Sequence, residues 1–189
     1  STSRGLGDVY KRQINDSGYF VFDVETDSLA DTMGLRLPNR SLYVVQGVVG
    51  AGKSLIAQRL VHGMLDNDVK VLVVTTELTT RGWIEQMESI GYGVTDALRE
   101  GRLMIFSRFG TVAEAKADVG LEDVLNSEAV SEADVIILDS ASALMPDNLD
   151  EHQRFELMQK LRKITSEGRS VMLCVDPDEM NHKLLHNLR

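Results

Sequence analysis

The sequence predicts an α/β protein whose mostly parallel, doubly wound sheet is flanked by helices. Short, continuous apolar runs recur along the chain, as in strands that are buried on both faces of a sheet. These runs span 42–45, 69–75, 103–106, 135–138 and 170–175. Segments with apolar residues at helical spacing alternate with the runs, and strands that alternate with helices form parallel sheets. A glycine-rich loop between the first of these strands and the first long helix is the third observation.

The composition indicates one globular domain. The chain has 189 residues, of which 43% are hydrophobic and 26% charged, which is enough for a sizeable core. We find no apolar run near the roughly 18 residues of a membrane span, and we expect no secretory leader. The net charge of −9 argues against a broad nucleic-acid-binding face. The single cysteine, Cys174, is predicted to be a small core residue, and a reducing cytoplasm fits.

Residues 1–13 are predicted to lie outside the folded domain, which we expect to span 14–189. They show no useful periodicity and resemble the adapter-derived leaders of translated metagenomic fragments. A disordered native tail is the alternative, and neither interpretation gives the segment a function.

The N-terminal part of the domain is predicted to hold two small elements. An apolar stretch at 19–24 indicates a strand, and Asp27 or Ser28 is expected to cap a brief helix over 29–33. A turn within 34–40 then leads into the first strand of the sheet.

Four helical regions are predicted farther along the chain. The first spans 55–65, and its buried stripe is expected to contain Leu55, Ile56, Leu60, Val61, Met64 and Leu65. His62 lies beside that stripe and is interpreted as a surface residue. A second helix runs over 83–90 and is stopped by Gly91, and 112–132 is helical in patches. The last helix, 151–167, is expected to point Phe155, Leu157, Met158, Leu161 and Ile164 inward.

The glycine-rich loop has the pattern G-x-x-x-x-G-K-[ST] between a strand and a helix, which predicts a phosphate cradle. The predicted nucleotide-binding residues are Gly47, Val48, Val49, Gly50, Ala51, Gly52, Lys53, Ser54 and Leu55. The glycines allow successive backbone N–H groups to face one anion, and the helix N-terminus adds partial positive charge. Lys53 is predicted to reach the β- and γ-phosphates as a catalytic residue, and Ser54 to bind Mg²⁺.

Acidic residues at three strand ends are expected near this loop, because ligands bind at the carboxyl ends of parallel strands. Asp139 follows four aliphatic residues and is predicted to hold the nucleotide's Mg²⁺ opposite Ser54. Glu77 is either a catalytic base for water or an acid that caps the next helix. Asp176 either senses the γ-phosphate or begins the Asp-Pro-Asp turn, and we favour the turn.

Several segments carry a resemblance to a known family. The run Asp139-Ser-Ala-Ser-Ala-Leu144 resembles the D-S-x-x-A-L motif of RecA-type ATPases. Segments 58–65, 75–80, 83–92 and 175–180 look like the KaiC-like ATPases of the archaeal swimming motor, the archaellum.

The resemblance implies a RecA-like fold that binds ATP and Mg²⁺ and switches conformation with at most slow hydrolysis. It implies a regulatory role under the motor, at the cytoplasmic face of the membrane, with only indirect membrane contact. The implied partners are the motor's hexameric ATPase and its cytoplasmic scaffold, and a homo-oligomeric ring is among the implied assemblies. Nucleic acid is not an expected partner.

The chain departs from the family pattern at three points. Members often carry an amide where Glu77 stands, so hydrolysis is chemically feasible here. KaiC-like proteins have a second glutamate at the position of Leu78. Members also continue beyond the position of Arg189 through strands that supply contacts to a neighbouring subunit, so we expect a truncated fragment.

Two other functions stay open at this stage. A RecA- or RadA-like enzyme would couple hydrolysis to DNA, and it should bind single-stranded DNA tightly with steep salt dependence. A KaiC-like signalling autokinase would place phosphate on its own Ser or Thr residues.

Overall fold

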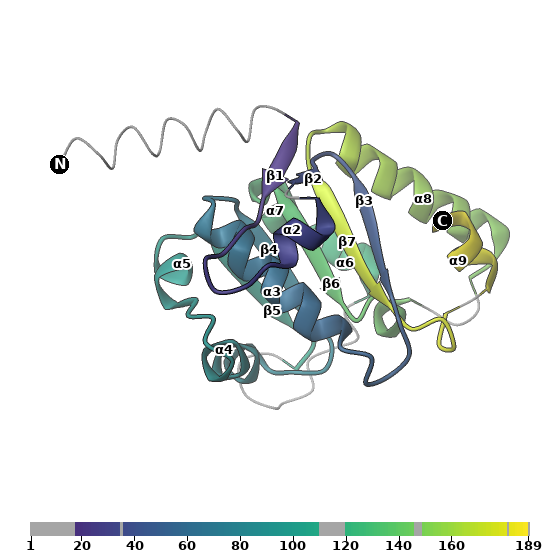
Figure 1. Cartoon of the computed structure of the whole chain (residues 1–189). Coiled ribbons are helices and arrows are strands. Elements are labelled where there is room, and N and C mark those ends of the chain that lie inside the picture. The colour runs from purple at the N-terminus through teal and green to yellow at the C-terminus, as the bar shows by residue number, and fades with distance from the viewer. Residues whose placement is uncertain (1–17, 35, 110–119, 146–148, 181, 189) are drawn as a thin grey trace.

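The computed structural model describes residues 18–34, 36–109, 120–145, 149–180 and 182–188 (Figure 1). The predicted leader at 1–13 and the first part of the segment 112–132 lie outside these residues. Within them, no helix is both long enough and apolar enough to cross a membrane.

A five-stranded parallel sheet forms the centre of the molecule, with strand order β3-β7-β6-β4-β5. The strands are β3 (Leu42–Gln46), β4 (Val71–Thr75), β5 (Leu103–Ser107), β6 (Val135–Asp139) and β7 (Ser170–Val175). Every residue of the three central strands is buried, as their continuous apolar sequences predict. The predicted parallel, doubly wound sheet is therefore confirmed.

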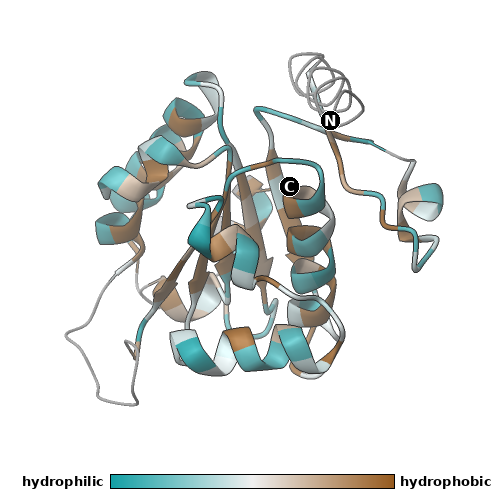
Figure 2. Ribbon diagram, turned by 90° about the vertical axis from the view of Figure 1, so that its left-hand side faces the viewer, coloured by the Kyte–Doolittle hydropathy of each residue, from teal (hydrophilic) through white to brown (hydrophobic). Residues whose placement is uncertain are grey.

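Helices cover both faces of this sheet (Figure 2). One face packs against α3 (Lys53–Asp66), α4 (Thr80–Ser89) and α5 (Thr95–Arg99). The other face packs against α6 (Leu121–Leu125), α7 (Glu128–Glu132), α8 (Glu151–Ser166) and α9 (His182–Leu188). Successive strand residues point to opposite faces: Val71 and Val73 join the first cluster, whereas Leu72 and Val74 join the second.

The N-terminal elements form a separate hairpin (Figure 1). Strand β1 (Tyr19–Val21) pairs antiparallel with β2 (Arg36–Pro38), and α2 (Leu29–Met33) lies between them in the sequence. The predicted strand and helix are confirmed. The turn was predicted at 37–40, within 34–40, and that prediction is wrong at Leu37 and Pro38, which belong to β2. Phe20 and Leu37 face each other in this pair and both are buried, so burial stabilises a strand that local turn residues alone disfavour.

A buried arginine joins the hairpin to α3. Arg59 donates from Nη1 to the Phe22 carbonyl at 2.9 Å and from Nη2 to Asp27 Oδ1 at 2.7 Å, and its Nε also donates to Asp27. The Leu29 N–H donates to Asp27 Oδ1 at 2.9 Å, so Asp27 rather than the Ser28 side chain holds the start of α2. This contact holds a charged residue, 5% exposed, among the buried residues of α3.

The sequence assigns three exposed residues to the core incorrectly. Leu55 and Ile56 are 53% and 42% exposed, because the first turn of α3 follows the glycine-rich loop and lies at the end of the sheet. Phe155 is 59% exposed. Residues two apart on a helix differ by about 200° in direction, so Phe155 and the buried Leu157 cannot both face the sheet.

His62 is also not a simple surface residue. Its ring stacks on Tyr92 with 4.6 Å between ring centroids. Its Nδ1 is buried and has no hydrogen-bond partner within the described chain, and its Nε2 lies 3.6 Å from Asp66 Oδ2. The other predicted members of the α3 stripe, Leu60, Val61, Met64 and Leu65, are buried as expected.

Candidate nucleotide-binding site

The loop between β3 and α3 has a backbone shape that requires glycine. Gly50 and Gly52 have φ angles of +78° and +84°, a region that side-chain-bearing residues rarely adopt. At Gly47 an added Cβ would lie 3.0 Å from the Ala51 Cβ, so a larger residue there would push against the loop. Val48 and Val49 are exposed on the loop, at 51% and 78%.

The start of α3 is open to an anion. The N-cap residue is Gly52, no side chain of the described chain caps the helix there, and the first turn holds no acidic residue. The first N–H groups of a helix lack backbone partners, and the helix dipole adds positive potential at the same end. A helix of 14 residues that starts this way offers donors and charge to a phosphate.

Lys53 rests on its own loop in this structure. Its Nζ donates to the carbonyl oxygens of Gly47 at 2.7 Å and Val48 at 3.0 Å. The same nitrogen lies 3.9 Å from Asp176 Oδ2 at the end of β7. The ammonium group is therefore held at the mouth of the loop by flexible contacts that an incoming phosphate can replace.

Ser54 and Asp139 meet at the same place. The Ser54 hydroxyl donates to Asp139 Oδ1 at 3.1 Å, although Asp139 ends strand β6. Burial raises the pKa of the Asp139 carboxyl above its ordinary value of 3.8; the Ser54 hydrogen bond opposes that shift and the negative charge of Glu77 adds to it. The pair presents a hydroxyl and a carboxylate oxygen, which are ligands that Mg²⁺ prefers.

Cys174 lies next to Asp139, and a hydrogen bond from its thiol acts to lower the pKa of the Asp139 carboxyl. It is fully buried, as predicted, and burial raises the pKa of its thiol, so the thiol stays neutral.

Glu77 follows β4 and its side chain is exposed. Its negative charge contributes to the raised pKa of Asp139. The cap of α4 is Thr79, whose Oγ1 accepts from the Gly82 N–H at 3.0 Å. Glu77 therefore does not supply the side-chain cap of that helix, and its catalytic role stays a prediction.

Asp176 combines the turn that the sequence predicts with a contact to the loop. Its Oδ1 accepts from the Asp178 N–H at 2.9 Å, which confirms the turn. Its Oδ2 is the group 3.9 Å from Lys53 Nζ, and the side chain is 4% exposed. The prediction that Asp176 is mainly a turn residue was therefore incomplete.

Hydroxyl groups that sequence reasoning missed connect the strand ends around the loop. The Asp176 N–H donates to Ser142 Oγ at 2.9 Å, and Ser140 Oγ donates to Ser142 Oγ at 3.2 Å. The Ser140 N–H donates to Thr76 Oγ1 at 3.0 Å. All four residues are buried. The sequence signal for these groups was the polar residues that follow the apolar strands. At one of these strand ends the peptide bond Asp139–Ser140 is cis.

The parallel sheet, the glycine loop with Lys53 at the start of a helix, and the Ser54–Asp139 pair define a P-loop nucleotide-binding protein. Residues 25–187 match the family model described as "ATPase: KaiC". The chain is 34% identical over 168 residues to the archaeal flagellar ATP-binding protein FlaH of Methanocaldococcus jannaschii, with 88% of this chain and 72% of the relative covered. It is 26% identical to FlaH of Methanococcus voltae, with coverages of 90% and 75%.

A solved structure agrees with these sequence matches. The crystal structure of the flagellar accessory protein FlaH from M. jannaschii superimposes with a TM-score of 0.78 at 30% identity, covering 91% of this chain and 76% of that one. The chain therefore belongs to the KaiC-like ATPases, in the family of the archaeal flagellar ATP-binding protein FlaH. The expected family and RecA-like fold are confirmed, and membership implies ATP binding.

Proposed function

We propose that the chain binds ATP with Mg²⁺ at residues 47–54 and regulates the archaeal flagellum motor through ATP-dependent conformational switching, with at most slow hydrolysis. The observation that carries the proposal is the Ser54–Asp139 hydrogen bond of 3.1 Å beside Lys53. It brings a hydroxyl, a carboxylate and an ammonium group to one loop, which is the set that a magnesium-bound triphosphate requires.

The residues fit a magnesium–nucleotide ligand without rearrangement of the fold. The backbone N–H groups of the loop and of the first turn of α3 would bind the phosphate oxygens, and Lys53 would exchange its carbonyl partners for them. Ser54 and Asp139 would hold Mg²⁺, which neutralises phosphate charge when it is bound. The described residues contain no cluster of three or more His, Cys, Asp or Glu side chains suited to a metal. This agrees with Mg²⁺, which usually keeps few protein ligands beside substrate phosphates.

We expect slow hydrolysis because of the exposure and orientation of the Glu77 carboxylate. A general base must be oriented toward the water that it deprotonates. Glu77 is exposed, and no hydrogen bond from the described residues fixes its carboxylate. We infer that Glu77 is able to act as the base but is poorly positioned, so binding rather than turnover is the main event.

Switching follows from the contacts of Lys53. If a phosphate binds the Lys53 ammonium group, Asp176 loses the positive charge that lies 3.9 Å from its carboxylate. Asp176 is hydrogen-bonded to Ser142 and to the turn that precedes α9, so the loss of that charge acts on both. A nucleotide shifts a conformational equilibrium only if it binds one state better, and this exchange supplies such a difference.

The relatives' names support a place in the archaeal flagellum. We propose that the chain acts at the cytoplasmic face of the membrane motor. We propose the motor's hexameric ATPase and its cytoplasmic scaffold as partners, with a homo-oligomeric ring as one form of assembly. Isothermal titration calorimetry with ATP and Mg²⁺ tests nucleotide binding. We expect binding heat with the unmodified protein and none with Lys53→Ala. Affinity of the motor ATPase for the ATP-bound and ADP-bound forms tests the conformational switch. Equal affinities would exclude the switch, and absent heat with the unmodified protein would exclude ATP binding.

A further inference from the structure

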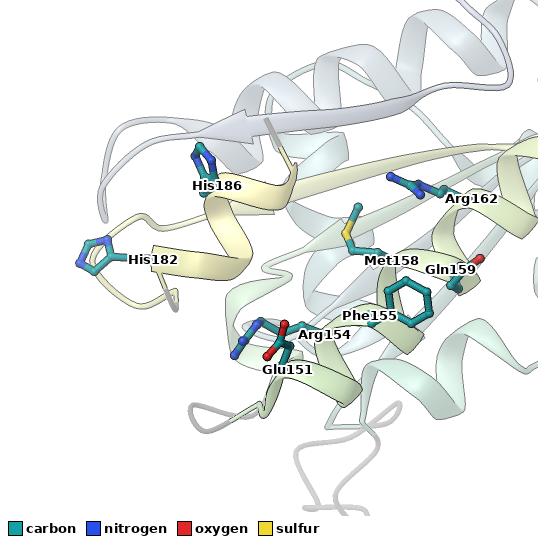
Figure 3. Close-up of a pocket in the computed structure, with 8 residues that line it drawn as sticks. All are labelled: Glu151, Arg154, Phe155, Met158, Gln159, Arg162, His182 and His186. Carbon is teal, nitrogen blue, oxygen red and sulfur yellow. The ribbon is translucent and has the colours of Figure 1, made fainter.

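One stripe of side chains runs along helix α8 beside α9 (Figure 3). The stripe consists of Glu151, Arg154, Phe155, Met158, Gln159 and Arg162. These positions follow the i, i+3, i+4, i+7 spacing of one helix face. Together with His182 and His186 of α9 they line a groove with a volume of about 670 Å³. The groove lies across the sheet from α3, so it is separate from the phosphate loop.

The centre of the stripe is apolar. Phe155 is 59% exposed, more than Tyr19 at 43% or Phe106 at 41%, the other exposed aromatic residues of the described chain. Met158 lies one turn away and is half-buried. A phenylalanine with that much exposed surface beside a methionine is a preferred anchor for another protein surface.

The two ends of the stripe carry opposite charges, and neither charged group is paired within the part of the chain that the structure describes. Neither the Glu151 carboxylate nor the Arg162 guanidinium makes an ion pair or a hydrogen bond with any described residue. They are eleven positions apart in the helix, about 16 Å along the axis, so they cannot pair with each other. Arg154 differs, because its Nη1 donates to the Leu149 carbonyl at 2.6 Å within the same molecule.

We propose that α8 of a second copy of this chain binds antiparallel along the stripe and forms a two-fold dimer. A two-fold axis midway between Phe155 and Met158 sets Glu151 of each copy opposite Arg162 of the other. The same axis sets each Phe155 against Met158 of the other copy, and each Arg154 beside Gln159. Self-complementarity of this kind is the requirement for an isologous interface.

Charge distribution selects a second copy over an unrelated acidic segment. An acidic segment would leave Glu151 facing a like charge, whereas the antiparallel copy pairs Glu151 and Arg162 at both ends. The antiparallel arrangement also opposes the two helix dipoles. One helix stripe on each side buries less than a standard interface of about 1,600 Å², so the dimer is expected to be weak and concentration-dependent.

Sedimentation velocity over a concentration series of the full chain tests the dimer. We expect reversible dimerisation of the unmodified protein. Glu151→Arg and Arg162→Glu should each raise the dimer Kd by roughly tenfold or more. The double variant E151R/R162E should restore the original Kd, because both pairs re-form with their signs reversed. Phe155→Ala should weaken the dimer without rescue by either charge change.

Matched controls make the same charge changes outside the stripe. Lys163→Glu and Glu156→Arg alter exposed residues of the same helix, and the Kd should stay near that of the unmodified protein. Circular dichroism checks that every variant is folded. A monomer at all concentrations overturns the proposal, as does an equal effect of Arg162→Glu and Lys163→Glu. A double variant as weak as the single variants overturns the antiparallel pairing.

Discussion

Ser54 and Asp139 are 85 positions apart in the sequence, yet the hydroxyl of one donates to the carboxylate of the other at 3.1 Å. The contact joins the first turn of α3 to the end of β6. It is the point at which the phosphate loop acquires a carboxylate, so it underlies the proposed magnesium and nucleotide chemistry.

Lys53→Ala should lower ATP affinity by roughly 100-fold, because the side-chain cation that lies on the loop carbonyls is lost. Titration calorimetry with ATP and Mg²⁺ measures the effect. Lys163→Ala, an exposed lysine on α8, is the control and should leave affinity unchanged. Full affinity in Lys53→Ala would remove the phosphate-cradle assignment.

Asp139→Asn should remove the gain in ATP affinity that Mg²⁺ gives, because the amide keeps the Ser54 hydrogen bond but loses the negative charge. ATP titrations in the presence of Mg²⁺ and in the presence of EDTA measure the gain in affinity for the unmodified protein and for the variant. A magnesium gain that persists in the variant would contradict the assigned metal ligand.

The same substitution should stabilise the nucleotide-free protein at neutral pH. Burial raises the pKa of Asp139, so the folded protein favours the protonated carboxyl. The stability that this group contributes is therefore full below pH 3.8 and is lost as pH rises through the raised pKa. At neutral pH the buried charge therefore costs stability that asparagine does not. Urea unfolding of both proteins measures this, and a less stable Asp139→Asn would contradict the sign.

Glu77→Gln should leave ATP affinity unchanged and reduce ATP turnover by roughly 100-fold, as expected for loss of a general base. Phosphate release under saturating ATP measures turnover. The control is Glu85→Gln, which changes an exposed acid paired with Arg81. Equal turnover in the Glu77 variant would show that its carboxylate takes no part.

Gly63→Ala should lower the free energy of unfolding by roughly 2 kcal/mol or more. An added Cβ would lie 2.1 Å from the Phe22 carbonyl oxygen and 2.7 Å from Arg59 Nη1, where the hairpin meets α3. Urea denaturation measures the loss. At Gly93 an added Cβ meets no atom within 4 Å, so Gly93→Ala is the matched control. Equal stabilities for the two variants would contradict the close approach.

Asp27→Asn tests the hairpin's charged contact through its pH dependence. The hydrogen bond from Arg59 lowers the pKa of Asp27 from 3.8 to about 2. A lowered pKa gives stability that is full above 3.8 and is lost as pH falls toward 2. Because the carboxylate is one-third exposed, we expect the substitution to cost only about 1 kcal/mol at neutral pH. The difference in unfolding free energy should shrink in acid, and a difference independent of pH would contradict the ion pair.

Local sequence determined the parts of this protein that depend on neighbouring residues. Continuous aliphatic runs produce β4, β6 and β7, because only a strand buried on both faces accommodates them. The glycines at 50 and 52 produce the loop, because other residues avoid their φ angles. The placement of Asp139 at a strand end was predictable for the same reason.

Tertiary structure decided which side of an element is buried and which distant groups meet. Leu55, Ile56 and Phe155 look like core residues by composition, but no sheet lies against them. Strand β2 forms because Leu37 pairs with Phe20 of β1. Asp176 lies close to Lys53 because β7 pairs with β3, the strand before the glycine-rich loop. Burial and long-range pairing are properties of packed elements, so a single sequence read locally contains the residues but not their partners.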